Sequence, residues 1–470
     1  MAQTVTQTQE KIRNPLGYKP VGGLLISFSV PAIISMLINS LYNIVDQIFI
    51  GQGVGYLGNA ATTVAFPIMT ILLAFATLIG AGASAYAAIK LGEGNDEEAE
   101  HTVGNAFAVA LVVGVALMVL GLLALEPLLR IFGATETVMP YAREYTSVIL
   151  LGAPFNVLSV VLSNLARTDG SPRLSMYGML IGAGINTILD PIYIFIFHWG
   201  VRGAAIATIT SQIISAAVLL VYFLRPIRKP IHMRIRLRCL MPQARRVASF
   251  LTLGISSGIT QSVACIMQIV MNNSLVFYGN LSPIGGDMAL SAMGIVSKIA
   301  MIIAGLGVGV GIGAQPIIGY NKGAEQYGRI RRTYGLAVAL ATALIFACWV
   351  ICQTIPEKII ALFGNESAAF TDFAVKCLRI YLFSIFCAGF QIVSTSYFQA
   401  TGQPVKASIL STLRQLLLLI PLVLILPRFF GLEGILYSAP VADLISALIV
   451  AAFIVPEMRR LNREVRESAA

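Results

Sequence analysis

Long apolar segments separated by short polar loops recur along the chain from Gly22 to Val455. Each is about 20 residues or longer, the length that an α-helix needs to cross roughly 30 Å of hydrocarbon. The pattern predicts twelve membrane-spanning helices, at approximately 22–50, 61–89, 104–129, 142–165, 174–197, 203–224, 247–278, 288–318, 333–355, 374–398, 407–427 and 433–455. The predicted fold class is therefore an all-α polytopic membrane protein.

The composition agrees with this prediction, and the distribution of Lys and Arg predicts how the protein is oriented in the membrane. Hydrophobic residues make up 57% of the chain and charged residues only 11%, with a mean hydropathy of +0.82, whereas about 25% of an average soluble domain is charged. The first span is too long for a signal peptide and lacks a small-residue cleavage pattern, so we expect it to stay as a helix. Most Lys and Arg fall in the loops on the side of both termini, which predicts cytoplasmic termini in the cell membrane.

The positive-inside bias also explains the net charge of +10. The basic run from Arg225 to Arg246 interleaves no stacking aromatic residues, so we interpret it as a cytoplasmic loop and expect no nucleic-acid partner. The six Cys have neither C-x-x-C spacing nor His partners, which argues against a metal centre or a disulfide framework.

The two halves of the chain repeat one another. "GAGASAYAAIKLGEGNDEEAEHTVGNAFAVAL" at 80–111 aligns with "GVGIGAQPIIGYNKGAEQYGRIRRTYGLAVAL" at 309–340, and Gly200-x-x-Gly203 answers Gly431-x-x-Gly434. Two six-helix repeats in the same orientation, around a central cavity, are typical of transporters that alternate access. We predict an N-terminal segment at 1–21, an N-lobe at 22–224, a basic linker at 225–246, a C-lobe at 247–455 and a cytoplasmic tail at 456–470.

Two carboxylates lie inside predicted spans of the first half. Asp46 belongs to "NSLYNIVDQIFIG" and Asp190 to "NTILDPIYIF", at similar depth, and the aligned positions of the second half carry no acid. An ionised side chain at this depth costs at least ~2.5–3.5 kcal/mol, so intramembrane acids usually mark ion or proton pathways. Two carboxylates in one cavity resist simultaneous ionisation, which suits the pair to carrying a proton or Na⁺.

Polar residues accompany both acids at helical spacing. Asn39, Tyr42 and Asn43 share a face with Asp46, Asn186 lies one turn before Asp190, and Thr208 and Gln212 mark the sixth span. These Asn, Thr and Gln residues can equally serve as hydrogen-bonded contacts between helices. Pro191 and Pro31 each remove one backbone donor and so predict local bending.

The second half holds three intramembrane charges, Lys298, Arg414 and Asp443. They are candidates for a substrate path, although Lys298 can equally belong to a buried ion pair and Arg414 lies near a cytoplasmic end, where a long side chain can snorkel. The segment "GLGVGVGIG" at 305–313 follows no strand, so we predict close helix packing there and no phosphate loop.

The stretches "LYNIVDQIFIG", "NTILDPIYIF" and "GAAIATITSQ", within twelve spans in two halves, resemble the multidrug and toxic compound extrusion (MATE) family. The resemblance implies a cofactor-free antiporter, not an enzyme, that exports amphipathic, often cationic, compounds in exchange for inward H⁺ or Na⁺. It implies that Asp46 and Asp190 form the coupling pair, with Tyr42, Asn186 and Thr208 around it and Na⁺, if used, at Asp46, Asp190 and Asn186. Asn39 and Asn164 match the family's cavity lining, and Asn43, Gln212 and Lys298 are further lining candidates. We expect a monomer whose partners are small molecules and the bilayer.

Other functions remain open at this point. A flippase of lipid-linked saccharides on a related fold would line its cavity with several Arg or Lys to hold phosphate. An intramembrane aspartyl protease also pairs two acids, but its Tyr-Asp and Gly-x-Gly-Asp motifs are absent around Asp46 and Asp190. A passive channel would not need the two-lobed repeat.

Overall fold

The computed structural model describes residues 15–54, 56–132, 134, 136–224, 233–361 and 368–467, without the side chains of Asn43, Ile44, Gln47, Tyr56, Asn59, Ala60, Leu237, Asp287 and Ala368. The first half contains α1 (Pro15–Tyr18), α2 (Val21–Val54), α3 (Tyr56–Gly92), α4 (Asp96–Leu123), α5 (Leu125–Ile131), α6 (Met139–Leu151), α7 (Ala153–Thr168), α8 (Pro172–Pro191), the π-helix η1 (Ile192–Ile196) and α9 (Gly200–Leu224). A short 3₁₀ turn, η2 (Leu237–Cys239), leads to the second half.

The second half contains α10 (Ala244–Asn280), α11 (Gly286–Gly323), α12 (Tyr327–Thr354), α13 (Pro356–Ala361), α14 (Ala368–Tyr381), the 3₁₀ turn η3 (Ile385–Cys387), α15 (Ala388–Ala400), α16 (Pro404–Thr412), the π-helix η4 (Leu413–Leu419), α17 (Ile420–Ile425), α18 (Pro427–Phe430) and α19 (Leu432–Glu467). Within the described ranges every regular element is helical.

Ten spans run as predicted, and two are bent. The fourth consists of α6 and α7, which meet at 50°, and the tenth consists of α14 and the η3–α15 segment, which meet at 40°. The first bend lies at Gly152-Ala153-Pro154, because the proline begins α7 and cannot continue the hydrogen bonding of α6. Several boundaries differ from the prediction: the third span begins at Asp96 and ends at Leu123, before the separate α5, α12 begins at Tyr327, and the last helix continues to Glu467.

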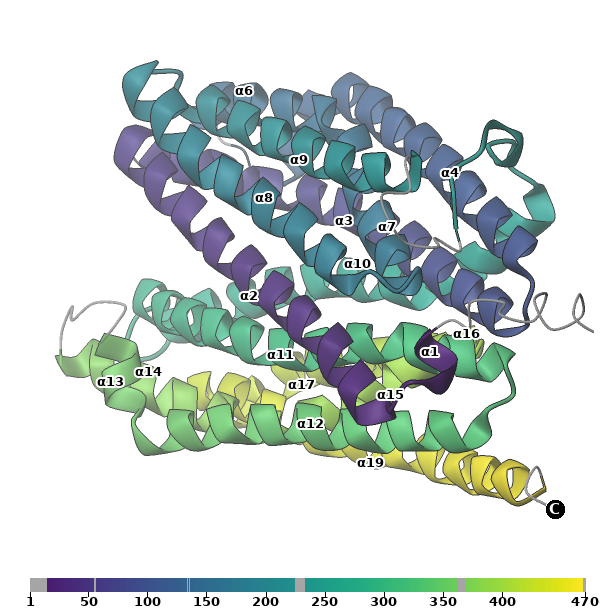
Figure 1. Cartoon of the computed structure of the whole chain (residues 1–470). Helices are drawn as coiled ribbons and strands as arrows, with labels where there is room; N and C mark the ends of the chain where they lie inside the picture. The colour runs from purple at the N-terminus through teal and green to yellow at the C-terminus, as the bar shows by residue number, and fades with distance from the viewer. Residues whose placement is uncertain are drawn as a thin grey trace, which may run out of the picture.

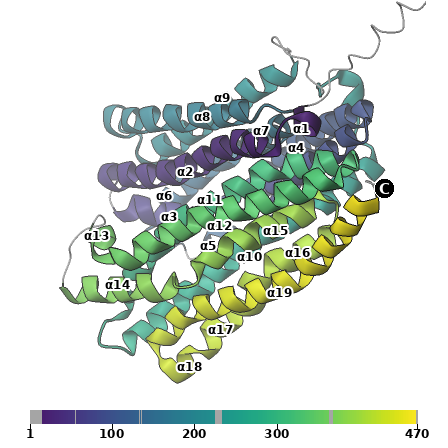
Figure 2. The same cartoon turned by 60° about the horizontal axis from the view of Figure 1, so that its bottom comes forward.

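The helices form two lobes, one from each half of the chain (Figures 1 and 2). Within the N-lobe, α3 packs on α7 and α8 packs on α9, while α11 packs on α12 and α15 in the C-lobe. The lobes meet reciprocally, since α2 packs on α11 and α3 packs on α10. The first two helices of each repeat therefore form the interface between lobes, as expected for a duplicated architecture.

Glycines allow the lobes to approach closely where they meet. A Cβ on Gly82 of α3 would lie 2.0 Å from the carbonyl oxygen of Phe250 in α10, and one on Gly254 would lie 1.8 Å from that of Leu78. On the other side, a Cβ on Gly309 of α11 would lie 2.6 Å from the Ile33 side chain of α2. The glycines at 305–313 thus serve helix packing, as the sequence predicts.

The segment before α10 is fastened to the N-lobe. The buried Asn105 of α4 donates from Nδ2 to the carbonyl oxygens of Cys239 (2.8 Å) and Met241 (3.0 Å), and its Oδ1 accepts from the backbone N–H of Gln243 (2.8 Å). Arg246, at the start of α10, binds both carboxylate oxygens of Glu98 in α4, at 2.8 and 2.7 Å. Residues 239–246 are therefore held by the first half although they lead into the second.

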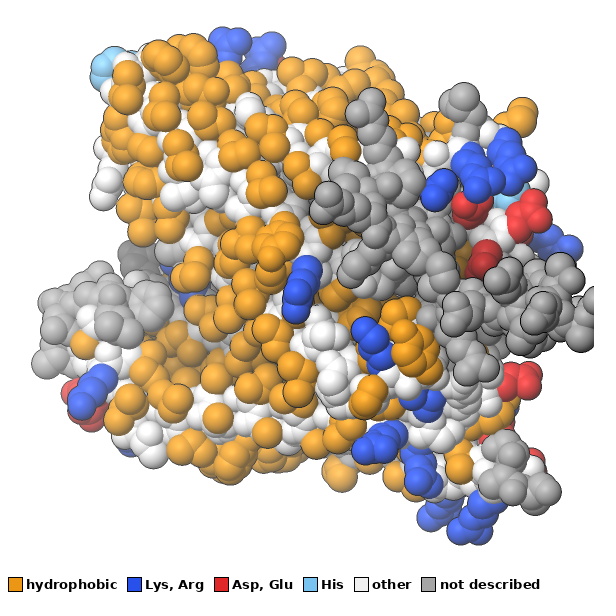
Figure 3. Space-filling view, in the orientation of Figure 1, with side chains coloured by type: hydrophobic (Ala, Val, Ile, Leu, Met, Phe, Trp, Pro, Cys, Tyr) orange, Lys and Arg blue, Asp and Glu red, His pale blue; other side chains and the backbone are white. Residues whose placement is uncertain are grey.

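The surface shown in Figure 3 is mainly hydrophobic along the flanks of the bundle. Charged side chains gather mostly at the end where Figure 1 places α1 and the C-terminus. We call this the terminal end of the bundle. An apolar belt with charged ends fits a protein whose flanks face lipid.

Candidate functional site

The two predicted acids lie together inside the N-lobe. Asp46 belongs to α2 and Asp190 to the last turn of α8, and these two helices pack against each other. Asp190 is fully buried and Asn186, one turn earlier, is 1% exposed. The helical spacing that predicted one polar face on α8 is therefore confirmed by the burial of both side chains.

Asn186 connects α8 to α9. Its Nδ2 lies 3.2 Å from Asp190 Oδ1 and 3.3 Å from Thr208 Oγ1, and Thr208 is buried. The amide therefore donates to a carboxyl group on its own helix and to a hydroxyl on the next span. Three of the predicted site residues, Asp190, Asn186 and Thr208, thus form one hydrogen-bonded group.

The carboxyl groups of Asp46 and Asp190 lie within hydrogen-bonding reach of each other. Among the described residues, no donor reaches three buried acceptor oxygens here: Asp46 Oδ1, Asp190 Oδ2 and Asn186 Oδ1. A carboxylate can only accept hydrogen bonds, so a bond between the two groups requires a proton on one of them. Three unpaired oxygens are also the kind of ligand that a hard cation such as Na⁺ prefers. The arrangement of the acid pair therefore fits either a proton or Na⁺.

Two tyrosines lie close to the acid pair. Tyr42 lies one turn before Asp46 on α2 and was predicted as a site residue. It interacts electrostatically with both Asp46 and Asp190. Tyr145 of α6 is 2% exposed and interacts electrostatically with Asp46, Asp190 and Tyr42. The sequence prediction missed Tyr145, because an uncharged tyrosine in the fourth span gives no signal of its own.

The helix changes form directly after Asp190. Pro191 ends α8, and η1 follows with a wider hydrogen-bond pattern in which the N–H of Phe197 donates to the carbonyl oxygen of Ile192. Single-turn π segments often occur at functional sites. The proline at 191 therefore coincides with a local change of geometry, whereas α2 continues through Pro31.

The predicted lining residues are more scattered. Asn164 of α7 donates to the carbonyl oxygen of Val160 and accepts from Arg167, so its hydrogen bonds lie outside the acid-pair group. Gln212 follows Thr208 by one turn on α9, and Asn39 lies two turns before Asp46 on α2. The side chain of Asn43 lies outside those described. Lys298 of α11 is exposed, and no ion pair involves it within the described ranges, so the buried-pair interpretation of this residue was wrong.

The other two charges of the C-lobe form a pair. Arg414 Nε of η4 hydrogen-bonds to Asp443 Oδ1 of α19, and Asp443 is 1% exposed. Arg414 therefore does not simply extend toward a cytoplasmic end. The described residues include no group of three or more His, Cys, Asp and Glu side chains placed to hold a metal ion.

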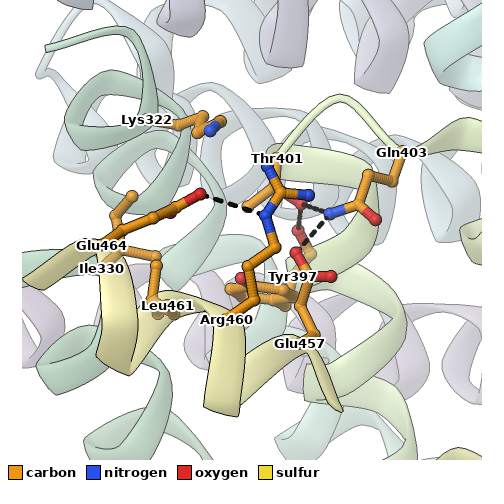
Figure 4. A pocket seen from close by; sticks show the side chains of 9 residues that line it. All are labelled: Lys322, Ile330, Tyr397, Thr401, Gln403, Glu457, Arg460, Leu461 and Glu464. Carbon is orange, nitrogen blue, oxygen red and sulfur yellow. Dashed lines mark hydrogen bonds and ion pairs between the residues drawn. The ribbon is translucent and has the colours of Figure 1, made fainter. Parts of the chain in front are cut away.

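A separate cavity of about 120 Å³ lies at the terminal end of the C-lobe (Figure 4). Gln403 donates to Glu457 there at 2.7 Å, and Arg460 donates to Glu464 one turn further along α19 at 3.0 Å, so both acids already have a hydrogen-bond partner. Its residues come from α11, α12, α15, α19 and the segment before α16. None of the sequence-predicted site residues lines this cavity.

Comparison with known proteins identifies the family. The MatE model matches residues 31–192 and 262–425, which include both acids and most of each lobe. The chain belongs to the MatE family. The resemblance stated from the motifs in the first, fifth and sixth spans is thereby confirmed.

Relatives of the MatE chain are export proteins. The multidrug export protein MepA of Staphylococcus saprophyticus is 28% identical over 428 residues, which cover 90% of this chain and 91% of that protein. MepA of Staphylococcus haemolyticus is 28% identical over 439 residues, 93% of each chain. Both alignments span the two lobes.

Solved structures share the fold. An outward-facing multidrug resistance MATE family transporter of the MOP superfamily has a TM-score of 0.86 at 24% identity, covering 94% of this chain and 96% of that one. MATE in the straight conformation has a TM-score of 0.88 at 23% identity, with coverage of 96% and 98%. These likenesses confirm the predicted fold class of a polytopic helical MatE protein with two lobes.

Proposed function

We propose that this MatE protein is a secondary active multidrug exporter, in which the Asp46–Asp190 pair couples the exit of amphipathic, mainly cationic compounds to the entry of H⁺ or Na⁺. The observation that carries the proposal is the contact between the half-buried carboxyl group of Asp46 and the fully buried one of Asp190, which lie on different helices. That contact needs a proton or a cation to be stable. The MepA relatives are multidrug export proteins, which supports the export of chemically diverse compounds.

The proposed mechanism is exchange by competition. When the cavity faces the cytoplasm, an ionised pair attracts an organic cation, whose apolar body contacts the surrounding side chains. When the cavity faces outward, an incoming H⁺ or Na⁺ neutralises the pair, and the organic cation loses its electrostatic partner. Asn186 and Thr208 hold Asp190 in place through both states.

The driving force is large enough for such an exchange. Each charge that crosses 100 mV of membrane potential supplies about 2.3 kcal/mol. A substrate gradient of tenfold requires about 1.4 kcal/mol. Inward movement of a single H⁺ or Na⁺ can therefore support more than tenfold accumulation of a neutral substrate outside. A one-for-one exchange with a monovalent organic cation moves no net charge, so it is driven by the concentration gradient of the coupling ion.

Proteoliposomes test this proposal. A fluorescent cationic dye is followed under an imposed pH gradient or Na⁺ gradient, with the wild type compared with Asp46→Asn and Asp190→Asn. Asp372→Asn is the matched control, because Asp372 is exposed on α14. We expect gradient-driven dye movement to be lost in both site variants and kept in the control, and the effective gradient identifies the coupling ion.

Two results would contradict the proposal. Undiminished transport in both site variants would remove the acid pair from the mechanism. Absence of dye movement in the wild type under any gradient, together with movement of a fluorescent lipid-linked saccharide, would favour the flippase instead.

A further inference from the structure

The last helix, α19, continues well past the apolar part of its span. Val455 ends the predicted span, and the helix runs on over residues 456–467, which we call the α19 extension. The buried Leu461 of this extension belongs to the hydrophobic core of the C-lobe. Asn462 Oδ1 accepts from Arg331 Nη1 of α12 at 2.9 Å. The α19 extension is therefore held against the C-lobe.

The charges of the α19 extension are separated by face. With about 100° per residue, Arg459, Arg463 and Arg466 fall within about 60° of one another around the helix axis. We call these three residues the arginine stripe. Glu457 and Glu464 lie on the opposite side, where they line the cavity of Figure 4 and each has a hydrogen-bond partner. The acidic face of the extension therefore meets the protein, and the basic face points away from it.

The arginine stripe lacks counterions within the described part of the chain. All three side chains are exposed, and no ion pair or hydrogen bond among the described residues involves their guanidinium groups. The neighbouring Arg460, by contrast, pairs with Glu464 at 3.0 Å. Figure 3 shows Lys and Arg side chains gathered at this end of the C-lobe. Like charges at this spacing destabilise a helix, so the stripe is favourable only beside an anion.

The arginine stripe continues the lipid-facing side of α19. Within the span, the exposed apolar side chains of this helix share one face with the stripe, to within about 80° around the axis. They are Val441, Ile445, Leu448 and Val455. Leu448, at 73% exposure, is the most open of them. One face of a single helix thus passes from the acyl chains to the surface of the bilayer.

The arginine stripe begins at the depth of the lipid headgroups. At 1.5 Å per residue, Arg459 lies about 6 Å beyond Val455 along the helix axis, and the headgroup region adds about 5–7 Å to each side of the hydrocarbon. Side chains on a helix lean toward its N-terminus, which here is the direction of the bilayer. Arg463 and Arg466 therefore reach back toward the headgroups.

We propose that the arginine stripe binds the phosphate groups of anionic phospholipids, in the leaflet at the terminal end of the bundle. A guanidinium pairs with two phosphate oxygens at once, and arginines three or four residues apart are close enough to share one phosphate. The positive-inside bias requires only that charge lies on this side of the membrane. Here the charge also lies on one face of a fixed helix, in line with its lipid contacts, and anionic lipid is the ligand that meets that face.

Native mass spectrometry of the solubilised protein measures this binding. Phosphatidylglycerol is titrated against the wild type and Arg459→Gln/Arg463→Gln/Arg466→Gln, with phosphatidylcholine of the same acyl chains as the zwitterionic lipid. The matched control removes three exposed arginines on the same predicted side of the membrane, from α8, η2 and the start of α10, as Arg173→Gln/Arg238→Gln/Arg245→Gln.

We expect the stripe variant to bind phosphatidylglycerol at least tenfold more weakly than the wild type, since each arginine near an anionic surface contributes about fivefold. The control variant should keep the affinity of the wild type. Phosphatidylcholine should bind all three proteins weakly and alike.

Chemical protection tests the same contact without any substitution. Phenylglyoxal modifies accessible guanidinium groups, and peptide mapping gives the rate at each arginine of the wild type in nanodiscs. We expect phosphatidylglycerol, added to phosphatidylcholine nanodiscs, to slow modification of the arginine stripe severalfold. Arg173, Arg238 and Arg245 should react at unchanged rates.

Four results would overturn the inference. Three are an equal loss of phosphatidylglycerol binding in the stripe and control variants, equal binding of the two lipids by the wild type, and equal protection of all six arginines. The fourth is protection of the stripe by a cytosolic extract and not by phosphatidylglycerol, which would assign this face to a soluble protein. If the stripe variant does not fold, the protection experiment decides the question.

Discussion

Asn186 is the residue on which the order of the N-lobe site depends. Its single amide nitrogen contacts both Asp190 and Thr208, so the carboxyl group and the hydroxyl are positioned relative to each other through one side chain. Removing either acceptor leaves the amide with one of these two hydrogen bonds, so its orientation is less constrained. The position of Asp190 relative to Asp46 is therefore sensitive to a hydroxyl on a third helix.

The Thr208 hydroxyl can be tested without changing the charge of the site. Thr208→Val removes the acceptor but keeps the shape of the side chain, and the loss of a buried hydrogen bond is worth about 1 kcal/mol. We expect the H⁺ or Na⁺ concentration for half-maximal dye transport to rise by roughly fivefold. Thr208→Ser keeps the hydroxyl and should resemble the wild type, and equal behaviour of the two variants would contradict the role of this bond.

At this scale, the sequence locates the acid pair better than the full set of polar residues around it. Asp46 and Asp190 could be singled out because a carboxylate in an apolar span has a high free-energy cost. Asn164 could not be separated from true neighbours of the pair, since amides also stabilise contacts between helices. Tyr145 was missed because a tyrosine in a span carries no comparable cost.

At the scale of elements, close contact between the lobes depends on glycines, which have no Cβ. Gly82 of α3 and Gly254 of α10 each lie where a Cβ would overlap a backbone carbonyl oxygen of the opposite helix. Backbone atoms cannot move aside as a flexible side chain can. Any larger residue must therefore separate the two helices at the terminal end of the bundle.

We expect Gly254→Val to shift the protein toward a state in which the terminal ends of the lobes are apart. Spin labels at Glu93 and Gln326, both exposed and in opposite lobes, report this distance once the six native cysteines are replaced. The distance distribution should gain a longer population. Gly335→Val is the matched control, because a Cβ there meets no atom within 4 Å; an unchanged distribution in Gly254→Val would refute the steric argument.

Element boundaries show where sequence reasoning loses information. Apolar length predicted the spans, but it cannot detect a bend when the residues on both sides are equally hydrophobic. The fourth span shows this, since Gly152 and Pro154 lie within one continuous apolar run and still divide α6 from α7. The tenth span bends near Ser384 without any proline, so its sequence offered no signal.

For the whole molecule, the distribution of charge predicts its orientation. The terminal end of the bundle carries most of the charged side chains visible in Figure 3, and the positive-inside bias predicts that this end faces the cytoplasm. We expect a green fluorescent protein fused after Ala470 to fluoresce in bacterial cells. The same protein inserted after Ser282, in the loop between α10 and α11, should stay dark, and the reverse pattern would contradict the predicted topology.

The fastening of the first turn of α10 to α4 has a mechanical consequence. Arg246 is held by Glu98, and the preceding residues are held by Asn105, so the first turn of α10 is fixed to α4, while the rest of the helix lies between α3 of the N-lobe and α11 and α16 of the C-lobe. Because α10 has 37 residues, a rotation of the helix about its fixed first turn displaces its other end the most. At a rise of 1.5 Å per residue, a rotation of about 10° about the first turn moves the C-terminal end of α10 by roughly 10 Å. A small angular change beside Glu98 is thereby amplified to the width of a drug molecule on the opposite face of the membrane.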